Sequence, residues 1–239
     1  MPQRKQWEYN SPVEMQLALA GNWSREDYLN HRVELANELA TFLHLDGSQD
    51  GFEIGSGEGI VARTLAAKCR SLDCTDISQT FLEAAESTCR DCANVGFHQI
   101  GTDFLDFLPA EQYDFGLSSN VFVHLNAYDI YFYLCSVRKI LRPQGTFVFN
   151  VVSIGESNRE MFHSQARVYR SHQDPIRTRG LMNWHGIDLI RQLVEEAGLS
   201  FDEGALRADS GGHFRVLAVK GASPCFDEAG RAPAGTVTP

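Results

Sequence analysis

The chain has 239 residues, a formal net charge of −10, and 43% hydrophobic and 22% charged residues, values that are ordinary for a folded globular protein. This composition excludes disorder of the whole chain, and no apolar run approaches the roughly 18 residues that a membrane-spanning helix requires. The acidic balance disfavours a nucleic-acid partner, and the polar start, MPQRKQWEYN, lacks the apolar core of a secretory signal. We therefore expect a cytoplasmic protein, monomeric or homodimeric, without a membrane or nucleic-acid partner.

Residues 1–46 are expected to form a helical cap. Ser11 is suited to cap a first helix and Ser24 a second, because a serine hydroxyl can accept a hydrogen bond from the first turn. After Ser24, apolar residues recur at helical spacing from Tyr28 to Leu43. Two helices are thus predicted before the chain enters its main domain.

Short strands then alternate with helices, which predicts an α/β domain over residues 47–220. In such a domain helices cover both faces of a parallel sheet, and ligands bind at the carboxyl ends of the strands. The predicted strands are Gly51–Ile54, Ser71–Asp76, Val95–Ile100, Tyr113–Ser118, Thr146–Val152 and Phe214–Lys220, and the predicted helices are Gly57–Cys69, Ser78–Cys92, Ala127–Leu141 and His185–Ala197. Residues 153–184 form an insertion, and residues 221–239 are expected to be a disordered tail.

The strongest motif follows the first predicted strand. It reads Glu53-Ile54-Gly55-Ser56-Gly57-Glu58-Gly59 and opens a predicted helix. Glycines there allow a tight turn and the close approach of a ligand, and a helix start offers unpaired N–H groups. A dinucleotide-binding loop would have a glycine where Ile60 stands, and a P-loop would have a lysine after the last glycine. A nucleotide-dependent oxidoreductase is therefore disfavoured.

Four further motifs follow in order around the ends of later strands. They are Thr75-Asp76-Ile77-Ser78, Gly101-Thr102-Asp103-Phe104, the segment Tyr113–Leu125, and Leu141-Arg142-Pro143-Gln144-Gly145. With the acidic-x-Gly-x-Gly-x-Gly motif, the series resembles the class I S-adenosylmethionine-dependent methyltransferases from about Gly51 to Val152. The resemblance implies a Rossmann-like, doubly wound, mostly parallel seven-stranded sheet. It also implies S-adenosyl-L-methionine as cofactor and S-adenosyl-L-homocysteine as product.

The resemblance further implies roles for individual residues. Asp76 would accept hydrogen bonds from ribose hydroxyls, although it could instead cap the next helix. Asp103 would bind the adenine amino group, with Asp106 as an alternative, and Glu53 would lie near the methionine end or pair with a surface lysine. The expected cofactor residues are Glu53, Gly55, Ser56, Gly57, Gly59, Asp76, Ile77, Asp103, Phe104, Ser119, Asn120 and Val121.

The segment after the fourth strand indicates the kind of substrate. It lacks the Asn/Asp-Pro-Pro-Tyr/Phe sequence of relatives that methylate amide or exocyclic amino nitrogens, and has Ser119-Asn120-Val121-Phe122 instead. We therefore expect in-line methyl transfer to an O, N or C nucleophile of a small metabolite or natural product. His124 is the candidate catalytic base, although it could instead pack at the start of the next helix. A tRNA or protein methyltransferase of the same fold, and a non-catalytic cofactor-binding module, remain alternatives.

The substrate pocket is expected to lie between the N-terminal segment and the 153–184 insertion. The candidate substrate residues are Tyr9, Trp23, Tyr28, His163, Tyr169, Trp184 and His185, with Trp7 on the same N-terminal wall. Arg32 could reach the carboxylate of the cofactor or belong to a solvated face. The arginines of the insertion could bind a carboxylate or phosphate, or form a charged face: Arg167, Arg170, Arg177 and Arg179.

No metal is expected, although two groups of residues raise the question. Three histidines of the insertion, His163, His172 and His185, lack a tight helical pair or a carboxylate cluster. The cysteines Cys69, Cys74, Cys89 and Cys92 include a CxxC pair, but Cys74 falls in a predicted strand, away from the flanking helices. Reduced thiols are the expected state.

Two positions depart from the family pattern. The first strand is preceded by Ser48-Gln49-Asp50-Gly51, which is unusually polar for a central strand. Gln144 stands where the family has the first glycine of a turn, so the backbone conformation at this residue is in question.

Overall fold

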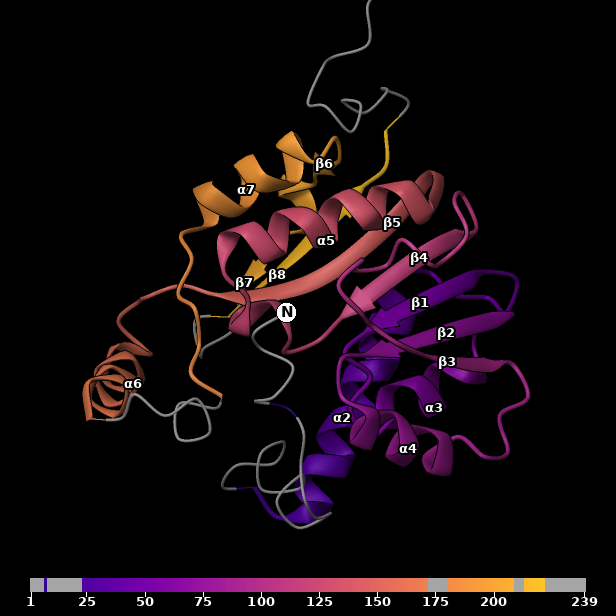
Figure 1. Ribbon diagram of the computed structural model, residues 1–239, viewed down its shortest axis with the longest axis horizontal. Helices are drawn as coiled ribbons and strands as arrows, with labels where there is room; N and C mark the ends of the chain where they lie inside the picture. The colour runs from indigo at the N-terminus through magenta and orange to yellow at the C-terminus, as the bar shows by residue number, and fades with distance from the viewer. Residues whose placement is uncertain (1–6, 8–22, 172–179, 209–212, 222–239) are drawn as a thin grey trace, which may run out of the picture.

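The computed structural model describes residues 7, 23–171, 180–208 and 213–221, and Figure 1 shows a central sheet with helices on both faces. The helix predicted to start at Ser11 and nearly all of the predicted tail, residues 222–239, lie outside the described residues. Within the described residues, no helix is both long and apolar enough to cross a membrane.

The described residues form an eight-stranded sheet in the order β3-β2-β1-β4-β5-β8-β6, with β7 paired to β8. The strands are β1 (Asp50–Ile54), β2 (Ser71–Asp76), β3 (Val95–Gln99), β4 (Tyr113–Ser118), β5 (Leu141–Val152), β6 (Ser200–Phe201), β7 (Arg207–Ala208) and β8 (His213–Val219). Strands β1 to β5 pair in parallel, whereas β8 pairs antiparallel with β5, β6 and β7. The expected doubly wound, mostly parallel sheet is thus confirmed, and its order switches between β1 and β4, where such folds bind ligands.

Helices cover both faces of this sheet (Figure 1). On one face lie α2 (Arg25–Phe42), α3 (Ile60–Ala66) and α4 (Gln79–Thr88), and on the other lie α5 (Ala127–Ile140) and α7 (Ile187–Glu196). Two short 3₁₀ helices are η2 (Phe122–His124) and η3 (Glu203–Ala205). The predicted cap of α2 is confirmed, because the Asp27 N–H donates to Oγ of Ser24 at 3.0 Å.

Helix α6 (Arg159–Ser171) lies in the insertion, where sequence reasoning predicted no element. None of its residues is buried, and Figure 1 shows it standing to one side of the sheet. A helix without a buried stripe lacks the core-facing pattern by which α5 and α7 were recognised.

The alternation of side chains along β1 positions the site. Successive strand residues point to opposite faces, so Phe52 packs on the α5 face, where it stacks on Phe147 at 5.8 Å and meets Tyr113 edge-on at 5.2 Å between ring centroids. Glu53 points to the opposite face, toward α2 and the buried Cys74. An acidic residue is therefore enclosed beneath the glycine-rich loop.

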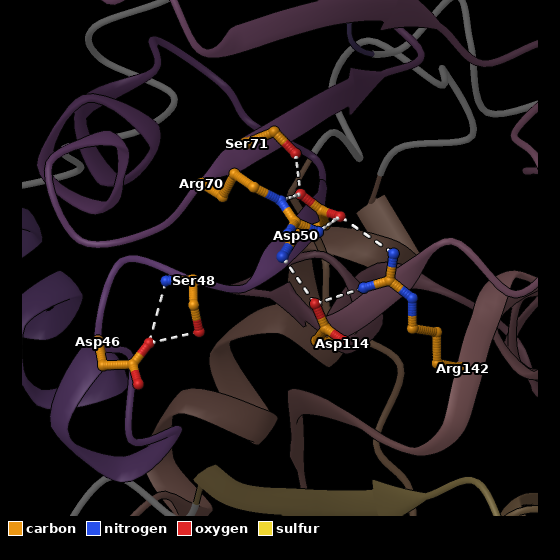
Figure 2. Close-up of polar contacts among 7 residues, drawn as sticks. All are labelled: Asp46, Ser48, Asp50, Arg70, Ser71, Asp114 and Arg142. Carbon is orange, nitrogen blue, oxygen red and sulfur yellow. Dashed lines mark hydrogen bonds and ion pairs between the residues drawn. The ribbon is translucent and has the colours of Figure 1, made fainter.

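The amino ends of the central strands are held by a cluster of charges (Figure 2). Asp50, at the start of β1, accepts hydrogen bonds from Arg70, from Oγ of Ser71 at 2.7 Å and from Arg142 at 3.1 Å. Arg142 also pairs with Asp114 at 2.6 Å, and Asp114 accepts the backbone N–H of Asp50 at 2.9 Å. The hydrogen bond from Arg70 is the largest cause that holds the pKa of Asp50 well below its usual range. These partners explain how a polar segment begins a central strand.

Gln144, near the start of β5, adopts the conformation that the family assigns to glycine. Its φ is 67°, in the left-handed region. Its N–H donates to the carbonyl of Lys220 at 3.0 Å, and the Lys220 N–H donates to the carbonyl of Gly145 at 2.9 Å. The turn therefore keeps its shape at the cost of strain at a side-chain-bearing residue.

Candidate cofactor and substrate site

A cavity of about 430 Å³ opens at the carboxyl ends of β1, β2 and β4, where the strand order predicts a ligand site. Cavities of this size suit small molecules. The glycine-rich loop forms one wall, and α2, η2 and residues 180 and 182 form others. Of the predicted cofactor residues, those that line the cavity are Gly55, Ser56, Gly57, Asp76, Ile77, Ser119, Asn120 and Val121.

The glycines of the loop serve different purposes. Gly55 has a φ of 75°, and a Cβ atom there would lie 2.1 Å from Cγ2 of Val121. Gly59 has a φ of 77° at the start of α3, and its Cβ would lie 2.8 Å from Cα of Ala85 on α4. Gly59 is thus required for helix packing and does not line the cavity, whereas Gly55 shapes the cavity wall.

Asp76, at the end of β2, organises the loop as well as lining the cavity. Its Oδ2 accepts the backbone N–H of Gly57 at 3.1 Å, and its Oδ1 accepts that of Ser78 at 2.9 Å. Ser78 itself caps α4, since its side chain accepts the N–H of Phe81. The capping role that the sequence left open for Asp76 therefore belongs to Ser78.

Two buried polar atoms beside the loop lack partners. Glu53 has no exposed surface, and burial raises its pKa to about 7. Among the described residues, neither Oε1 of Glu53 nor Oγ of Ser56 has a hydrogen-bond partner. Such atoms are rare in folded proteins and indicate a place for a ligand or water. The surface-lysine pairing considered for Glu53 does not occur, because the side chain is fully enclosed.

Helix α2 contributes Arg32 and Tyr28 to the cavity wall. Arg32 is only 9% exposed and donates to Oγ of Ser119 at 3.0 Å. Its charge partly offsets the effect of burial on the pKa of Glu53. Arg32 is therefore a cavity residue, and the alternative interpretation, that it belongs to a solvated face, is wrong. Burial also raises the pKa of Tyr28.

His124, in η2, lines the cavity and lies 5.0 Å from the ring of Trp7, measured between centroids. Its Nδ1 is 3.1 Å from the carbonyl oxygen of Leu181. A carbonyl oxygen only accepts, so Nδ1 carries the proton and Nε2 carries the lone pair. Burial lowers the pKa of His124 below its ordinary value of 6.5, which favours the neutral ring that a base requires.

Asp103 and Phe104 do not line the cavity. Asp103 is exposed, and Phe104 packs edge-on against Tyr133 at 4.9 Å between ring centroids. The alternative, Asp106, accepts a hydrogen bond from the α5 residue Ser136 at 3.2 Å and is also absent from the lining. Ile100 and Tyr133 line this part of the cavity instead. Sequence reasoning missed them because their apolar character is also that of core residues.

The predicted substrate residues of the N-terminal segment have different positions. Tyr28 lines the cavity, as does Trp7. Trp23 does not: it is 51% exposed and meets the ring of His31 edge-on at 4.7 Å between centroids. Tyr9 lies outside the described residues.

The predicted substrate residues of the insertion lie away from the cavity. His163 and Tyr169 are exposed on α6. Trp184 packs on a phenylalanine of α6, and His185 is buried with Nε2 2.8 Å from the carbonyl oxygen of Leu125. Trp184 and His185 connect the end of the insertion to the body of the protein, since both also contact the backbone of Val152.

Other residues of the same region do reach the cavity. Gly180 and Met182 line it, and so does His213 at the start of β8. Asn183 joins this segment to η2, because its N–H donates to the carbonyl of Val123 and its Nδ2 donates to the carbonyl of His124, both at 2.7 Å. The sequence carried no pattern that distinguishes these positions from neighbouring loop residues.

The cationic and thiol clusters form no second site in the described chain. Arg167 and Arg170 are exposed on α6, while Arg177, Arg179 and His172 lie outside the described residues. Within the described part of the chain, no group of three or more His, Cys, Asp or Glu residues could hold a metal. The thiols of Cys69, Cys74 and Cys89 are free and buried, and that of Cys92 is half-buried.

Comparisons with known proteins agree with this geometry. Residues 52–145 match the family model described as a methyltransferase domain. No curated protein sequence matches the chain. Among solved structures, magnesium protoporphyrin IX methyltransferase from Synechocystis, with bound S-adenosylhomocysteine, has a TM-score of 0.61 at 13% identity, covering 91% of this chain and 92% of its own.

Two further structures show the same fold. A protein provisionally described as a sarcosine dimethylglycine methyltransferase from Galdieria sulphuraria has a TM-score of 0.61 at 20% identity, covering 82% of this chain and 88% of its own. A methyltransferase dependent on S-adenosylmethionine from Methanosarcina mazei has a TM-score of 0.61 at 15% identity, covering 76% and 96%.

The fold, the glycine-rich loop and the family match together define the class. Residues 52–145 carry a methyltransferase domain on a Rossmann-like fold, and the protein is an enzyme whose cofactor is S-adenosylmethionine.

Proposed function

We propose that the protein transfers a methyl group to a nucleophile of a small molecule, such as a metabolite or natural product, bound in the cavity beside the cofactor. One observation carries the proposal: a single cavity joins the glycine-rich loop and Asp76 to His124. The cofactor-binding elements and the candidate base therefore face the same space, as direct transfer requires.

The residues around the loop fit S-adenosylmethionine. We assign the ribose hydroxyls to Asp76, whose carboxylate borders the cavity. The buried Oε1 of Glu53 and Oγ of Ser56, without partners among the described residues, suit the ammonium end of the cofactor, and Arg32 suits its carboxylate. When bound, the cofactor supplies a methyl group activated by a sulfonium sulfur.

His124 is placed to accept the proton that an alcohol, phenol or ammonium nucleophile must lose. Its Nδ1–H is held by the carbonyl of Leu181, so the basic atom is Nε2. Burial among Trp7 and the η2 residues favours the neutral form. We propose that His124 acts as general base, a role typically worth about 10²- to 10⁴-fold in rate.

The wall beyond the cofactor residues supports a small molecule as substrate. Among the described residues, it consists of apolar and imidazole side chains together with Gly180: Trp7, Val123, His124, Leu125, Met182 and His213. Because the chain has a net charge of −10, a nucleic-acid substrate would meet an unfavourable field.

The first experiment is a calorimetric titration of the folded protein with S-adenosylhomocysteine, with NADH in parallel. We expect micromolar binding of the first and none of the second. Asp76→Ala should weaken binding by about 10- to 100-fold, since a hydrogen bond to a charged group contributes about 1.5–3 kcal/mol. Asp73→Ala is the matched control, because Asp73 lies on the same strand and bonds His98 and Tyr113 outside the cavity.

A screen of small acceptors by methyl-mass shift then tests turnover. Absence of S-adenosylhomocysteine binding to folded protein would remove the proposed cofactor site. Binding without transfer to any acceptor would favour a non-catalytic module. Once an acceptor is found, His124→Ala with turnover within about twofold of wild type would exclude His124 as the base.

A further inference from the structure

Tyr133 reaches the cavity from α5, and the proposed reaction gives it no role. Helix α5 begins shortly after η2, which borders the cavity, and helical side chains lean toward the amino end of their helix. Tyr133 is only 2% exposed and lines the cavity. Its ring packs edge-on against that of Phe104 at 4.9 Å and lies 5.8 Å from that of Phe122, measured between centroids. The ring is therefore enclosed by aromatic neighbours, which leaves the hydroxyl group to face the cavity.

The hydroxyl group of Tyr133 has no hydrogen-bond partner among the described residues. It is not one of the two fully enclosed polar atoms without partners, which belong to Glu53 and Ser56. The hydroxyl therefore touches open space, and the space that Tyr133 borders is the cavity. Burial, followed by the charges of Asp76 and Asp129, raises the pKa of Tyr133, so the group stays neutral and can both donate and accept. An unpaired polar group in such a place indicates a ligand.

The wall beside Tyr133 suits a flat, apolar ring. The N–H of Ile100 donates to the carbonyl of Asp76 at 2.9 Å, so Ile100 adjoins the aspartate that we assign to the ribose. Ile77 follows Asp76 directly, and both isoleucines line the cavity and belong to the same hydrophobic cluster as Tyr133. Adenine is attached to the ribose, so this wall lies next to the place of the base. The faces of the base would meet isoleucine side chains, and its polar edge needs a partner.

The loop after β3 turns away the carboxylate that the family resemblance assigns to adenine. Asp103 is exposed, and its Oδ1 lies over its own loop, 2.9 Å from where a Cβ atom of Gly101 would be. Phe104 has a φ of 53°, a conformation that is unfavourable for a residue with a Cβ atom. Its ring packs on Tyr133 instead of opening the loop to the cavity. The loop thus supports the tyrosine and withdraws the aspartate.

We propose that Tyr133 is a specificity-determining residue for the nucleobase of the cofactor, and that its hydroxyl oxygen accepts a hydrogen bond from the 6-amino group of adenine. Tyr133 takes the role that the family resemblance implies for Asp103. The contact comes from a helix after β4 rather than from the loop after β3. This inference rests on the proposed function, because it takes Asp76 as the partner of the ribose.

Tyr133→Phe tests the contact, because it keeps the ring and removes only the hydroxyl group. The variant and the wild type are titrated calorimetrically with S-adenosylhomocysteine and with the analogue that has hydrogen in place of the 6-amino group. We expect the variant to bind S-adenosylhomocysteine about three- to tenfold more weakly, the effect of one neutral hydrogen bond. Its affinity for the analogue should stay within about twofold of wild type, since the analogue has no amino group to donate. Unchanged S-adenosylhomocysteine affinity, or an equal loss for both ligands, overturns the proposal.

Two further variants test where the coupling arises. Tyr28→Phe is the matched control, because Tyr28 also lines the cavity but lies on α2, with Arg25 over its ring at 5.6 Å. Any change that it causes should be the same for both ligands. Asp103→Asn should leave both affinities unchanged, because the carboxylate is exposed. A loss in Asp103→Asn that is specific to the ligand with the amino group would return the role to Asp103 and overturn the proposal.

The stability of the ligand-free protein separates a ligand contact from a structural one. Removing an unpartnered hydroxyl should not lower the urea midpoint of Tyr133→Phe. Tyr113→Phe is the contrasting variant, since the hydroxyl of Tyr113 donates to Asp73 at 2.7 Å, and its midpoint should fall. A lowered midpoint in Tyr133→Phe would mean that the protein itself holds the hydroxyl, which overturns the proposal. Failure of folded wild-type protein to bind S-adenosylhomocysteine would contradict the proposed function instead.

Discussion

Strand β1 carries two buried carboxylates, and their surroundings differ in kind. Near its amino end, Asp50 accepts hydrogen bonds from Arg70, Ser71 and Arg142, which hold its pKa well below the usual range (Figure 2). Toward its carboxyl end, Glu53 is fully buried, one oxygen lacks a partner among the described residues, and its pKa is about 7. Burial is therefore common to structural and ligand-binding carboxylates. What separates them is whether their oxygens are satisfied.

The largest expected effect is the loss of stability on substitution of Asp50, the carboxylate whose oxygens are satisfied. Asp50→Ala leaves Arg70 and Arg142 without their shared carboxylate and should cost about 3 kcal/mol in the free energy of unfolding, measured by urea denaturation. Asp46→Ala is the control, because Asp46 is exposed and its carboxylate accepts from Ser48 in the same loop (Figure 2). It should cost less than about 0.5 kcal/mol. Similar losses in both variants would contradict a special role for Asp50.

Substitution of Glu53, the carboxylate with an unsatisfied oxygen, should change the free energy of unfolding in the opposite direction. The folded-state pKa of Glu53 is about 7, above its ordinary 4.5. Between these values the unfolded chain releases a proton that the folded protein keeps, so stability falls as pH rises through this window and changes no further above it. Glu53→Gln removes this loss and should be about 2 kcal/mol more stable than wild type at pH 8, with little difference near pH 4.5.

Unfolding of both proteins at the two pH values tests this prediction. Asp50→Asn is the contrasting control, since a lowered pKa contributes stability above the ordinary value of 3.8 that is lost as pH falls further. It should therefore be less stable than wild type at pH 8. A stability difference for Glu53→Gln that is the same at both pH values would mean that the pKa of Glu53 is not raised in the folded protein. The variant should also bind S-adenosylhomocysteine more weakly.

Substitutions in the glycine-rich loop change the packing, rather than the charge, at the carboxyl end of β1. Gly55→Ala places a Cβ atom against Val121 at a positive φ, and should cost about 2 kcal/mol in stability and reduce S-adenosylhomocysteine affinity. Val121→Ala removes the clash but not the backbone strain, so the double variant should recover part of both losses. Calorimetry and urea unfolding of all four proteins give the coupling. Strictly additive losses would exclude the contact as the cause.

Much of the fold was predictable because its signals are local. The limits of β2 and β4 were predicted without error, and α5 to within one residue, since turn residues and apolar periodicity mark them. Helix α6 was missed, because a helix with no buried residue lacks a core-facing stripe. The insertion was therefore recognised as a unit without its internal structure.

Site residues could be predicted where a local motif fixes the backbone at the end of a strand. They could not be predicted where segments distant in the sequence come together. Gly55, Asp76 and Asn120 line the cavity because each directly follows a strand. Asp103 also follows a strand, yet the chain turns it outward, and Tyr133 reaches the cavity from a helix. His213 was not selected, because its place at the cavity depends on how β8 pairs with β5.

The smallest predicted effect qualifies the contrast between the two ends of the sheet. Gln144 belongs to the amino-end turn, yet it is exposed and strained at a φ of 67°. A left-handed conformation costs a residue with a Cβ roughly 1–2 kcal/mol, whereas glycine loses more entropy on folding, so Gln144→Gly should gain about 0.5–1 kcal/mol in urea unfolding. Gln79→Gly, at an exposed helical position in α4, should lose a similar amount. A loss in both variants would mean that the turn tolerates glutamine without strain. If Gln144→Gly gains stability, Gln79→Gly loses it, and S-adenosylhomocysteine affinity stays unchanged, the strain at Gln144 has no part in function. Backbone strain would then not mark a functional residue in this protein, whereas an unsatisfied buried carboxylate would.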